Sequence, residues 1–255
     1  MLALIFAAGL GTRLRPLTDT MPKALVTLAG HSLLEYQILK LKAAGIMDII
    51  INVHHFPDMI INYLRQHDNF GCNVMISDER NLLLDTGGGL LKAWQTFAAD
   101  SHEPILALNV DILSTIRLED VFASYNSAEA GVLVVKSRQT QRYLCFDNTN
   151  RLIGWTNTAT GEYRPALSTF DLQLTTKLAF SGMQILSPDV LPMLQEFAKQ
   201  NGPKFSVIDF YLSALQNAVF RGFEPQGELL DVGKIDHLSE AETFAASLNI
   251  TTKCK

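Results

Sequence analysis

Hydrophobic and polar positions follow one another in blocks that predict strands and helices in turn. A first apolar run, Leu2 to Ala8, is typical of a buried strand. Segments 46–53 and 73–77 have the same character, and predicted helices at about 32–44 and from residue 57 separate the three runs. Such alternation predicts a parallel sheet with right-handed crossovers. We therefore expect an α/β fold with a Rossmann-like, mixed but mainly parallel sheet flanked by helices.

The second half of the chain predicts a different arrangement. After a fourth apolar run at 105–111 and a fifth at 130–136, β-rich segments become short and are separated by turns that contain Asn and Gly. These short segments lie at 143–147, 151–155 and 177–186. They predict a small antiparallel sheet beside the parallel one. Helices are predicted at about 189–198, 206–217 and 238–245.

Composition and charge narrow the class of protein. The chain has 255 residues, of which 47% are hydrophobic and 18% charged, as expected for one globular domain. A net charge of −5 without a long basic run argues against a nucleic-acid partner. The three scattered cysteines, Cys72, Cys145 and Cys254, indicate a reducing compartment and no zinc site. No apolar run reaches the length of a membrane span, so we expect a cytoplasmic protein without a membrane partner.

A glycine-rich loop follows the first strand. Gly9 and Gly11 permit a tight turn whose N–H groups can face an anion. Three cationic side chains follow at Arg13, Arg15 and Lys23. Together they predict a polyphosphate pocket. The dinucleotide fingerprint requires a third glycine where Leu14 stands, and a Walker A loop requires Gly-Lys-Ser/Thr, so the loop belongs to neither type.

Two aspartates and a glycine triplet add candidate chemistry. Asp111 and Asp231 each end an apolar run, and Mg²⁺ is usually held by one or two carboxylates together with substrate phosphates. An aspartate in such a place can also be a helix N-cap. Gly87 to Gly89 open a helical segment, which predicts free backbone amides for a ligand, although a flexible turn is the alternative.

The glycine loop carries a family resemblance. The string from Gly9 to Thr18, followed by Pro22 and Lys23, resembles the signature of the sugar-phosphate nucleotidyltransferases. These enzymes join an NTP and a sugar 1-phosphate into an NDP-sugar and pyrophosphate. Three further motifs are similar to the family's second nucleotide loop, its magnesium-binding pair and its closing motif, and they lie at Leu84–Gly89, Asn109–Asp111 and Asp231–Gly233.

The resemblance covers about residues 2 to 247 and implies a single nucleotidyltransferase domain of GT-A-like type at 1–247. A nucleotide-binding half would take about 1–136 and a sugar-binding half, with the small antiparallel sheet, about 137–247. Catalysis would rest on positioning and charge neutralisation, with a sugar-phosphate oxygen attacking the α-phosphorus of the NTP.

Individual roles follow from the resemblance. Catalytic roles are implied for Arg13, Lys23, Asp111 and Asp231, with Mg²⁺ held by the two aspartates. Nucleotide contacts are implied for Ala7, Ala8, Gly9, Gly11, Thr12, Arg13, Lys23, Glu79, Gly87 and Gly88. Sugar contacts are implied for Asn109, Asn157 and Gly182.

The identity of the substrates remains open at this stage. The chain most resembles the uridylyltransferases that act on N-acetylmuramate 1-phosphate in cell-wall recycling, with guanylyltransferases for mannose 1-phosphate or heptose 1-phosphate as the alternative. A non-catalytic NDP-sugar-binding protein and an NAD-dependent oxidoreductase are the rival functions, and the missing third glycine argues against the latter. We expect small-molecule substrates only, and a monomer or a small homo-oligomer.

Overall fold

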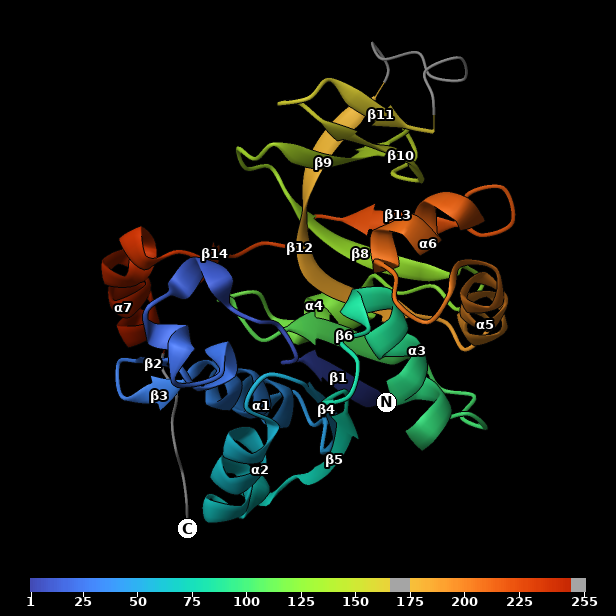
Figure 1. The fold of residues 1–255 in the computed structure, drawn as a ribbon. Helices are drawn as coiled ribbons and strands as arrows, with labels where there is room; N and C mark the ends of the chain where they lie inside the picture. The colour runs from blue at the N-terminus through green and yellow to red at the C-terminus, as the bar shows by residue number, and fades with distance from the viewer. Residues whose placement is uncertain (166–174, 249–255) are drawn as a thin grey trace. The chain divides into compact units, whose positions relative to one another are not determined.

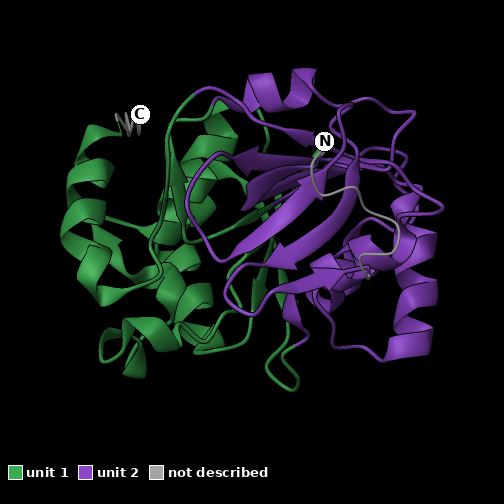
Figure 2. Cartoon of the chain, turned by 90° about the horizontal axis from the view of Figure 1, so that it is seen from above, with its two compact units in different colours: residues 1–83, 108–116, 227–255 green, residues 84–107, 117–226 purple. Residues whose placement is uncertain are grey.

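The computed structural model describes residues 1–165 and 175–248 (Figure 1). The chain divides into two compact units, each built from separate segments (Figure 2). Unit 1 comprises Met1–Leu83, Leu108–Ile116 and Gly227–Lys255, and unit 2 comprises Leu84–Ala107 and Arg117–Gln226. The chain passes between the two units after residues 83, 107, 116 and 226, whereas the sequence analysis placed a border between two halves near residue 136. The single domain stays a prediction.

Unit 1 contains the predicted parallel sheet. Its strands include β1 (Leu2–Phe6), β4 (Asp48–Val53) and β5 (Asn73–Asp78). β4 pairs in parallel with both β1 and β5, in a register that places Ile5 opposite Ile51. Both isoleucines are fully buried. A strand covered on both faces has no solvent side, which explains why β1 is a continuous apolar run and why β4 is apolar except at Asp48 and Asn52.

Helices α1 (Leu33–Ala43) and α2 (Pro57–Gln66) connect these strands (Figure 1). The predicted start of α1 is confirmed, because the Ser32 side chain accepts a hydrogen bond of 3.0 Å from the backbone N–H of Glu35. Shorter elements complete this part of unit 1, namely η1 (Thr12–Leu14), η2 (Leu17–Asp19), η3 (Lys23–Leu25), β2 (Thr27–Leu28), β3 (His31–Ser32) and η4 (Asp68–Gly71).

The predicted strand at 105–111 is interrupted, which corrects the placement of Asp111. Strand β6 (Ile105–Asn109) ends before a two-residue turn, and β7 (Ile112–Ser114) follows it. Asp111 therefore lies in the turn rather than at a strand end. β7 pairs in antiparallel fashion with β14 (Leu229–Asp231), and η7 (Ile235–His237) and α7 (Leu238–Ser247) follow β14.

Unit 2 contains the predicted antiparallel strands. These are β8 (Gly131–Lys136), β9 (Arg142–Phe146), β10 (Leu152–Asn157), β11 (Glu162–Arg164) and β12 (Thr176–Leu186). β12 pairs in antiparallel fashion with β8 and β9, and β13 (Phe220–Phe223) adds a parallel pairing to β8. Its helices are α3 (Asp85–Phe97), α4 (Leu118–Ala123), α5 (Val190–Asn201) and α6 (Val207–Ala214). The α/β fold class is thereby confirmed.

Two of the three cysteines lie among the described residues. Cys72 and Cys145 are free thiols and buried, and Cys254 lies outside the described residues. Burial raises the pKa of the Cys145 thiol to about 11, so this side chain is a packing group at neutral pH. Within residues 1–165 and 175–248, none of the helices combines the length and apolar character that a bilayer crossing requires.

Candidate functional site

The glycine loop turns tightly at residue 11, in a left-handed backbone conformation that favours glycine. Gly11 has φ of 63°, and a Cβ atom there would lie 2.8 Å from Cγ2 of Thr18. Its carbonyl oxygen accepts hydrogen bonds of 2.8 Å from Oγ1 of Thr18 and from the N–H of Leu14. The side chains of Thr12 and Arg13 remain exposed. The loop is therefore held from within by Thr18 while its outer side is accessible.

Lys23 and Asp111 form an ion pair between Nζ and Oδ2. They are 88 residues apart in the sequence, and both side chains are largely buried, with 10% and 19% of their surface exposed. Lys23 is placed by η3 directly after Pro22, and Asp111 by the turn between β6 and β7. Two residues predicted to be catalytic are thus in direct contact.

Asp231 and Arg13 lie against Gly233. A Cβ atom at Gly233 would stand 2.6 Å from Oδ1 of Asp231 and 3.1 Å from Nη2 of Arg13. The backbone N–H of Val232 donates a hydrogen bond of 2.9 Å to the carbonyl oxygen of Asp111. Arg13, Lys23, Asp111 and Asp231 are therefore linked within unit 1, and their catalytic roles stay predictions.

Helix α1 supports the turn that carries Asp111. The Gln37 side chain, 2% exposed, donates hydrogen bonds to the carbonyl oxygens of Val110 at 3.4 Å and Ile112 at 2.8 Å, on either side of Asp111. Lys40, one helical turn further on, donates to the carbonyl oxygen of Ser114 at 3.0 Å. Sequence reasoning missed both residues. The available signal was a pair of polar residues, the buried Gln37 and the half-buried Lys40, spaced three apart on an otherwise apolar helix face.

Ala7, Ala8 and Glu79 have other partners than the predicted nucleotide. Oδ1 of Asn52 accepts from the N–H groups of Ala7 at 2.7 Å and Ala8 at 3.2 Å, and Nδ2 of Asn52 donates to Oε1 of Glu79 at 2.7 Å. Glu79 is 1% exposed. In this structure the Glu79 side chain is buried and its Oε1 atom accepts from Asn52, and its contact with the base or sugar stays a prediction.

Gly87 and Gly88 also require a correction. The sequence predicted free amides at this helix start, but both N–H groups donate to the carbonyl oxygen of Phe205, at 2.9 and 3.2 Å. Cβ atoms at these positions would lie 2.4 Å from the Phe205 ring and 2.1 Å from the Pro203 carbonyl oxygen. The glycines let α3 approach the 203–205 segment closely. Contact of the base with other atoms of this loop stays a prediction.

The predicted sugar-binding residues occupy defined backbone positions. Asn109 is the last residue of β6, and Asn157 is the last residue of β10. Oδ1 of Asn157 accepts a hydrogen bond of 3.0 Å from the N–H of Ala159 in the following turn. Gly182 has φ of 71° at a bulge of β12, which accounts for glycine there. Their contact with a sugar remains a prediction.

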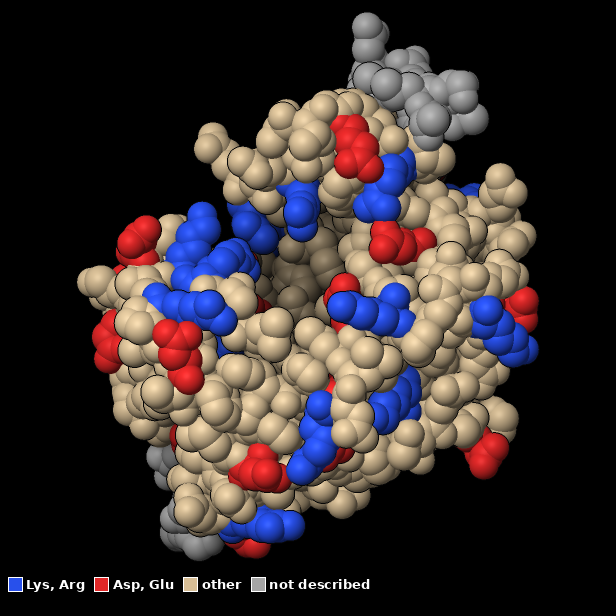
Figure 3. All heavy atoms as spheres, viewed as in Figure 1, with Lys and Arg blue, Asp and Glu red and all other residues tan. Residues whose placement is uncertain are grey.

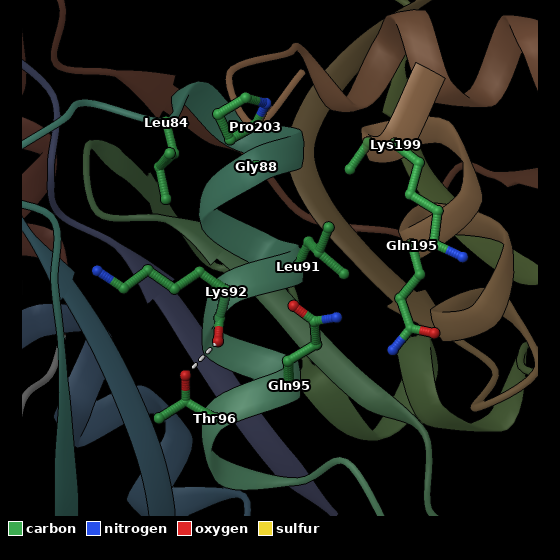
Figure 4. Close-up of a pocket in the computed structure, with 10 residues that line it drawn as sticks. Leu84, Gly88, Leu91, Lys92, Gln95, Thr96, Gln195, Lys199 and Pro203 are labelled. Atoms are coloured by element: carbon green, nitrogen blue, oxygen red, sulfur yellow. Dashed lines mark hydrogen bonds between the residues drawn. The ribbon is translucent and has the colours of Figure 1, made fainter. Parts of the chain in front are cut away.

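A pocket of about 540 Å³ lies in unit 2, where α3 and α5 approach each other (Figure 4). Among the ten described residues that line it are Gln95, Gln195, Lys92 and Lys199, and none of the ten is Asp or Glu. Among the predicted site residues only Gly88 contributes to this lining. The pocket therefore differs in composition from the charged cluster of unit 1.

On the face drawn in Figure 3, several basic side chains lie near one another, with acidic side chains interspersed. Among the described residues, no group of three or more His, Cys, Asp or Glu side chains could hold a metal ion. The cluster of unit 1 contributes two carboxylates, and Asp111 already accepts the ammonium group of Lys23. Hard oxygen ligands beside a phosphate loop suit Mg²⁺, which takes its remaining ligands from phosphates and water.

The described residues form an α/β fold with a charged cluster beside a glycine-rich loop. A comparison with protein families matches residues 2–247 to the nucleotidyl transferase family. The chain therefore belongs to the nucleotidyl transferase family, and the resemblance noted in the sequence is confirmed.

Two curated relatives illustrate the similarity. An N-acetylmuramate α-1-phosphate uridylyltransferase of Caulobacter vibrioides is 41% identical over 112 residues, which are 43% of this chain and 45% of that protein. A mannose-1-phosphate guanyltransferase of Schizosaccharomyces pombe is 28% identical over 255 residues, covering 97% of this chain and 65% of that protein. The chain thus spans about half to two thirds of the length of these relatives.

Solved structures show the same fold at low sequence identity. HddC from Yersinia pseudotuberculosis, complexed with GMP-PN, superposes with a TM-score of 0.73 and 21% identity, over 94% of this chain and 97% of that chain. A UDP-glucose pyrophosphorylase from Acinetobacter baumanii gives a TM-score of 0.74 and 20% identity, over 94% of this chain and 91% of that chain. The likeness establishes the fold.

Proposed function

We propose that this protein transfers a nucleotidyl group from an NTP to a sugar 1-phosphate, giving an NDP-sugar and pyrophosphate. The observation that supports this activity best is the grouping of Arg13, Lys23, Asp111 and Asp231 in unit 1, beside the glycine loop. These four residues come from three separate stretches of the chain. Two cationic and two anionic groups in one place match the needs of a polyphosphate and its cation.

The residues present suffice for phosphoryl chemistry by positioning. The loop from Gly9 to Arg13 binds the phosphates of the NTP, and an oxygen of the sugar 1-phosphate attacks the α-phosphorus. The bond from the α-phosphorus to the bridging oxygen breaks, and pyrophosphate leaves with that oxygen. The attacking phosphate carries a charge of about −1.5 to −2 at pH 7, so the reaction requires no general base. Arg13 neutralises charge on the leaving pyrophosphate. The ammonium group of Lys23 leaves the Asp111 carboxylate and binds a phosphate oxygen of the substrate instead.

Asp111 and Asp231 would hold the metal ion, and the site suits Mg²⁺. When bound there, the ion supplies positive charge to the phosphate oxygens. Gln37 keeps the Asp111 turn in place through the carbonyl groups of Val110 and Ile112. The protein's own contribution is thus a fixed pair of carboxylates rather than a complete metal cage.

For the substrates we propose UTP and N-acetylmuramate 1-phosphate. The support is the 41% identity to a uridylyltransferase of that name over 112 residues. The alternative, a mannose-1-phosphate guanylyltransferase, is supported by a relative that matches 97% of this chain at 28% identity. Recognition of a uracil edge by the amides of Gly87 and Gly88 is not part of this proposal, because both amides donate to Phe205.

The test is pyrophosphate release from four NTPs, each combined with a panel of sugar 1-phosphates. We expect the highest kcat/KM for UTP with N-acetylmuramate 1-phosphate. Preference for GTP with mannose 1-phosphate would replace the proposed substrates and leave the reaction class intact. Absence of pyrophosphate release from every pair, with NDP-sugar binding retained in a direct titration, would favour the non-catalytic binding protein instead.

A further inference from the structure

Asn52 is a buried polar residue within an otherwise apolar strand. It lies in β4, one position before the end of the strand, and only 2% of its surface is exposed. The parallel register places Asn52 opposite Phe6, the last residue of β1. Beyond Phe6, the chain leaves the sheet and becomes the glycine loop. A polar side chain at this point therefore lies where the backbone of β1 loses its strand partners.

The Asn52 side chain takes over the hydrogen bonds that the sheet no longer provides. Its Oδ1 atom accepts from the N–H groups of Ala7 and Ala8, at 2.7 and 3.2 Å, and the two alanines are 2% and 4% exposed. Water has little access to these amides, and a buried N–H group without an acceptor is costly. Asn52 thus supplies the acceptor that lets the chain turn from β1 into the loop.

Glu79 fixes which way the Asn52 amide points. Nδ2 of Asn52 donates to Oε1 of Glu79 at 2.7 Å, so Oδ1 must face the two alanine amides. A carboxylate can only accept, and the reversed amide would place two acceptors against each other. Glu79 is itself held at its backbone, because its N–H donates to the carbonyl oxygen of Val53 at 2.7 Å and Nδ1 of His54 lies 2.8 Å from its carbonyl oxygen.

We propose that Asn52 is a positioning residue for the nucleotide loop, acting through the amides of Ala7 and Ala8, with Glu79 setting its orientation. The proposal rests on the proposed function only in that the loop binds the NTP. Asn52 itself touches no substrate. Its effect is to fix the path of the chain into Gly9 and Gly11, so its loss displaces the phosphate-binding loop more than it disturbs the sugar side.

An exchange of the two side chains tests this arrangement. Asn52→Asp places a second carboxylate against Glu79, and we expect the KM for the NTP to rise about ten- to a hundredfold, the loss expected for a buried hydrogen bond. The double variant N52D/E79Q restores one hydrogen-bond donor and one acceptor at this contact, with the two roles exchanged. The side-chain amide introduced at position 79 can donate to the carboxylate introduced at position 52, and that carboxylate still accepts from both alanine amides. We expect its KM for the NTP to return to within about threefold of the wild type.

A matched control is available on the same two strands. Asn73 of β5 donates from Nδ2 to Oδ1 of Asp48, at the exposed opposite end of the β4–β5 pair, at 2.8 Å. Asn73→Asp makes the same chemical change far along the strand from the loop. We expect it to leave both KM values unchanged. The KM for the sugar 1-phosphate serves as an internal control in every variant, because a general loss of fold would affect both substrates.

Hydrogen exchange at the Ala7 and Ala8 amides gives a readout that does not depend on activity. We expect faster exchange at these two amides in Asn52→Asp and wild-type protection in N52D/E79Q. An unchanged KM for the NTP in folded Asn52→Asp, or a double variant no better than the single one, would overturn the proposal. Wild-type protein that turns over no NTP would instead refute the proposed function, and the exchange rates would still decide the role of Asn52.

Discussion

At the scale of the residue, the ion pair of Lys23 and Asp111 is the feature with the clearest chemical consequence. Both groups are largely removed from water, so each depends on the other for compensation of its charge. Substitution of one partner leaves an unpaired buried charge. In the proposed reaction, the phosphates of a bound NTP would attract Lys23 and its cation would attract Asp111. The pair therefore holds the two groups in place before substrate arrives.

The aspartates carry the first prediction. Asp111→Asn and Asp231→Asn should each nearly abolish pyrophosphate release at any Mg²⁺ concentration, because an amide oxygen is a weaker ligand than a carboxylate. Activity across a Mg²⁺ titration is the measurement, with circular dichroism to check the fold. Asp48→Asn, in the exposed start of β4, is the control. Full activity of either variant, or of the wild type in EDTA, would contradict the metal assignment.

Arg13 carries the second prediction. Its side chain is exposed beside Gly233 and Asp231, so its removal leaves no cavity in the core. Arg13→Ala should lower kcat by about 10²–10³, which is the usual effect of removing one hydrogen-bond donor to a charge that develops in the transition state. The free energy of unfolding should change by no more than about 0.5 kcal/mol. Arg65→Ala, on the exposed side of α2, is the matched control. A large loss of stability with kcat unchanged would make Arg13 a structural residue.

At the scale of the element, α1 does more than cover the sheet. Gln37 and Lys40 lie on one helix face and donate to three backbone carbonyl groups of the β6–β7 region. A helix is stiffer than a loop, so these hydrogen bonds give the Asp111 turn the rigidity that its own two residues lack. The proposed metal site would depend in this way on a helix that contributes no ligand to it.

The third prediction follows from this support. Gln37→Leu should raise the Mg²⁺ concentration for half-maximal activity by about 10- to 100-fold, the usual effect of removing a group that holds a metal ligand. Direct Mn²⁺ binding, followed by electron paramagnetic resonance, should weaken in parallel. Lys42→Leu, whose Nζ donates to the Phe70 carbonyl oxygen on another side of α1, is the control. Unchanged Mn²⁺ affinity in Gln37→Leu would remove Gln37 from this role.

Helix α3 supplies the fourth prediction. Gly88→Ala would place Cβ 2.1 Å from the Pro203 carbonyl oxygen, so α3 must move away from the 203–205 segment. We expect a loss of about 1–3 kcal/mol in the free energy of unfolding, measured by urea denaturation. Gly9→Ala is the stability control, because its Cβ would meet no atom within 4 Å. Equal stability of the two variants would show that close packing is not the reason for glycine at 88.

At the scale of the whole molecule, ligand binding should appear as a gain in stability. Mg²⁺ and UTP at 100 times the dissociation constant should stabilise the folded chain by about 2.7 kcal/mol. For a protein of this size that corresponds to a rise in Tm of roughly 5–10 °C. Thermal melts with UTP, with and without EDTA, are the measurement. If UTP raises Tm in the presence of EDTA by as much as it does with Mg²⁺, nucleotide binding does not depend on the metal ion.

Local patterns predicted most elements, and motifs predicted the charged cluster. The apolar runs at 2–8 and 46–53 and the Ser32 cap are local signals, so the sequence identified strands β1 and β4 and the start of α1. Arg13, Lys23, Asp111 and Asp231 were identified because each stands in a recognisable string of residues. Their linkage in unit 1 agrees with that prediction, while their catalytic roles remain to be tested.

What the sequence could not reveal depends on contacts between distant segments. The glycines at 87 and 88 were interpreted as ligand contacts because nothing nearby indicates the packing of Phe205, 117 and 118 residues further on. Asn52 carried a signal, since a polar residue within an Ile-Ile-Ile-Asn-Val run must find a partner when buried. Its partners, Ala7 and Glu79, lie 45 and 27 residues away, so no local pattern could name them.

Unit 1 is built from three separate segments of the chain, and this determines when its parts are synthesised on the ribosome. The unit takes its first 83 residues from the start of the chain, yet β14, the partner of β7, is translated only after residue 226. All of unit 2 has been synthesised by then. At about 5–20 residues per second, Asp231 joins the nascent chain after unit 2 is complete and well after Lys23 and Asp111. The nascent protein therefore acquires Asp231 after Arg13, Lys23 and Asp111, and a chain that ends before residue 227 lacks β14, the strand that pairs with β7.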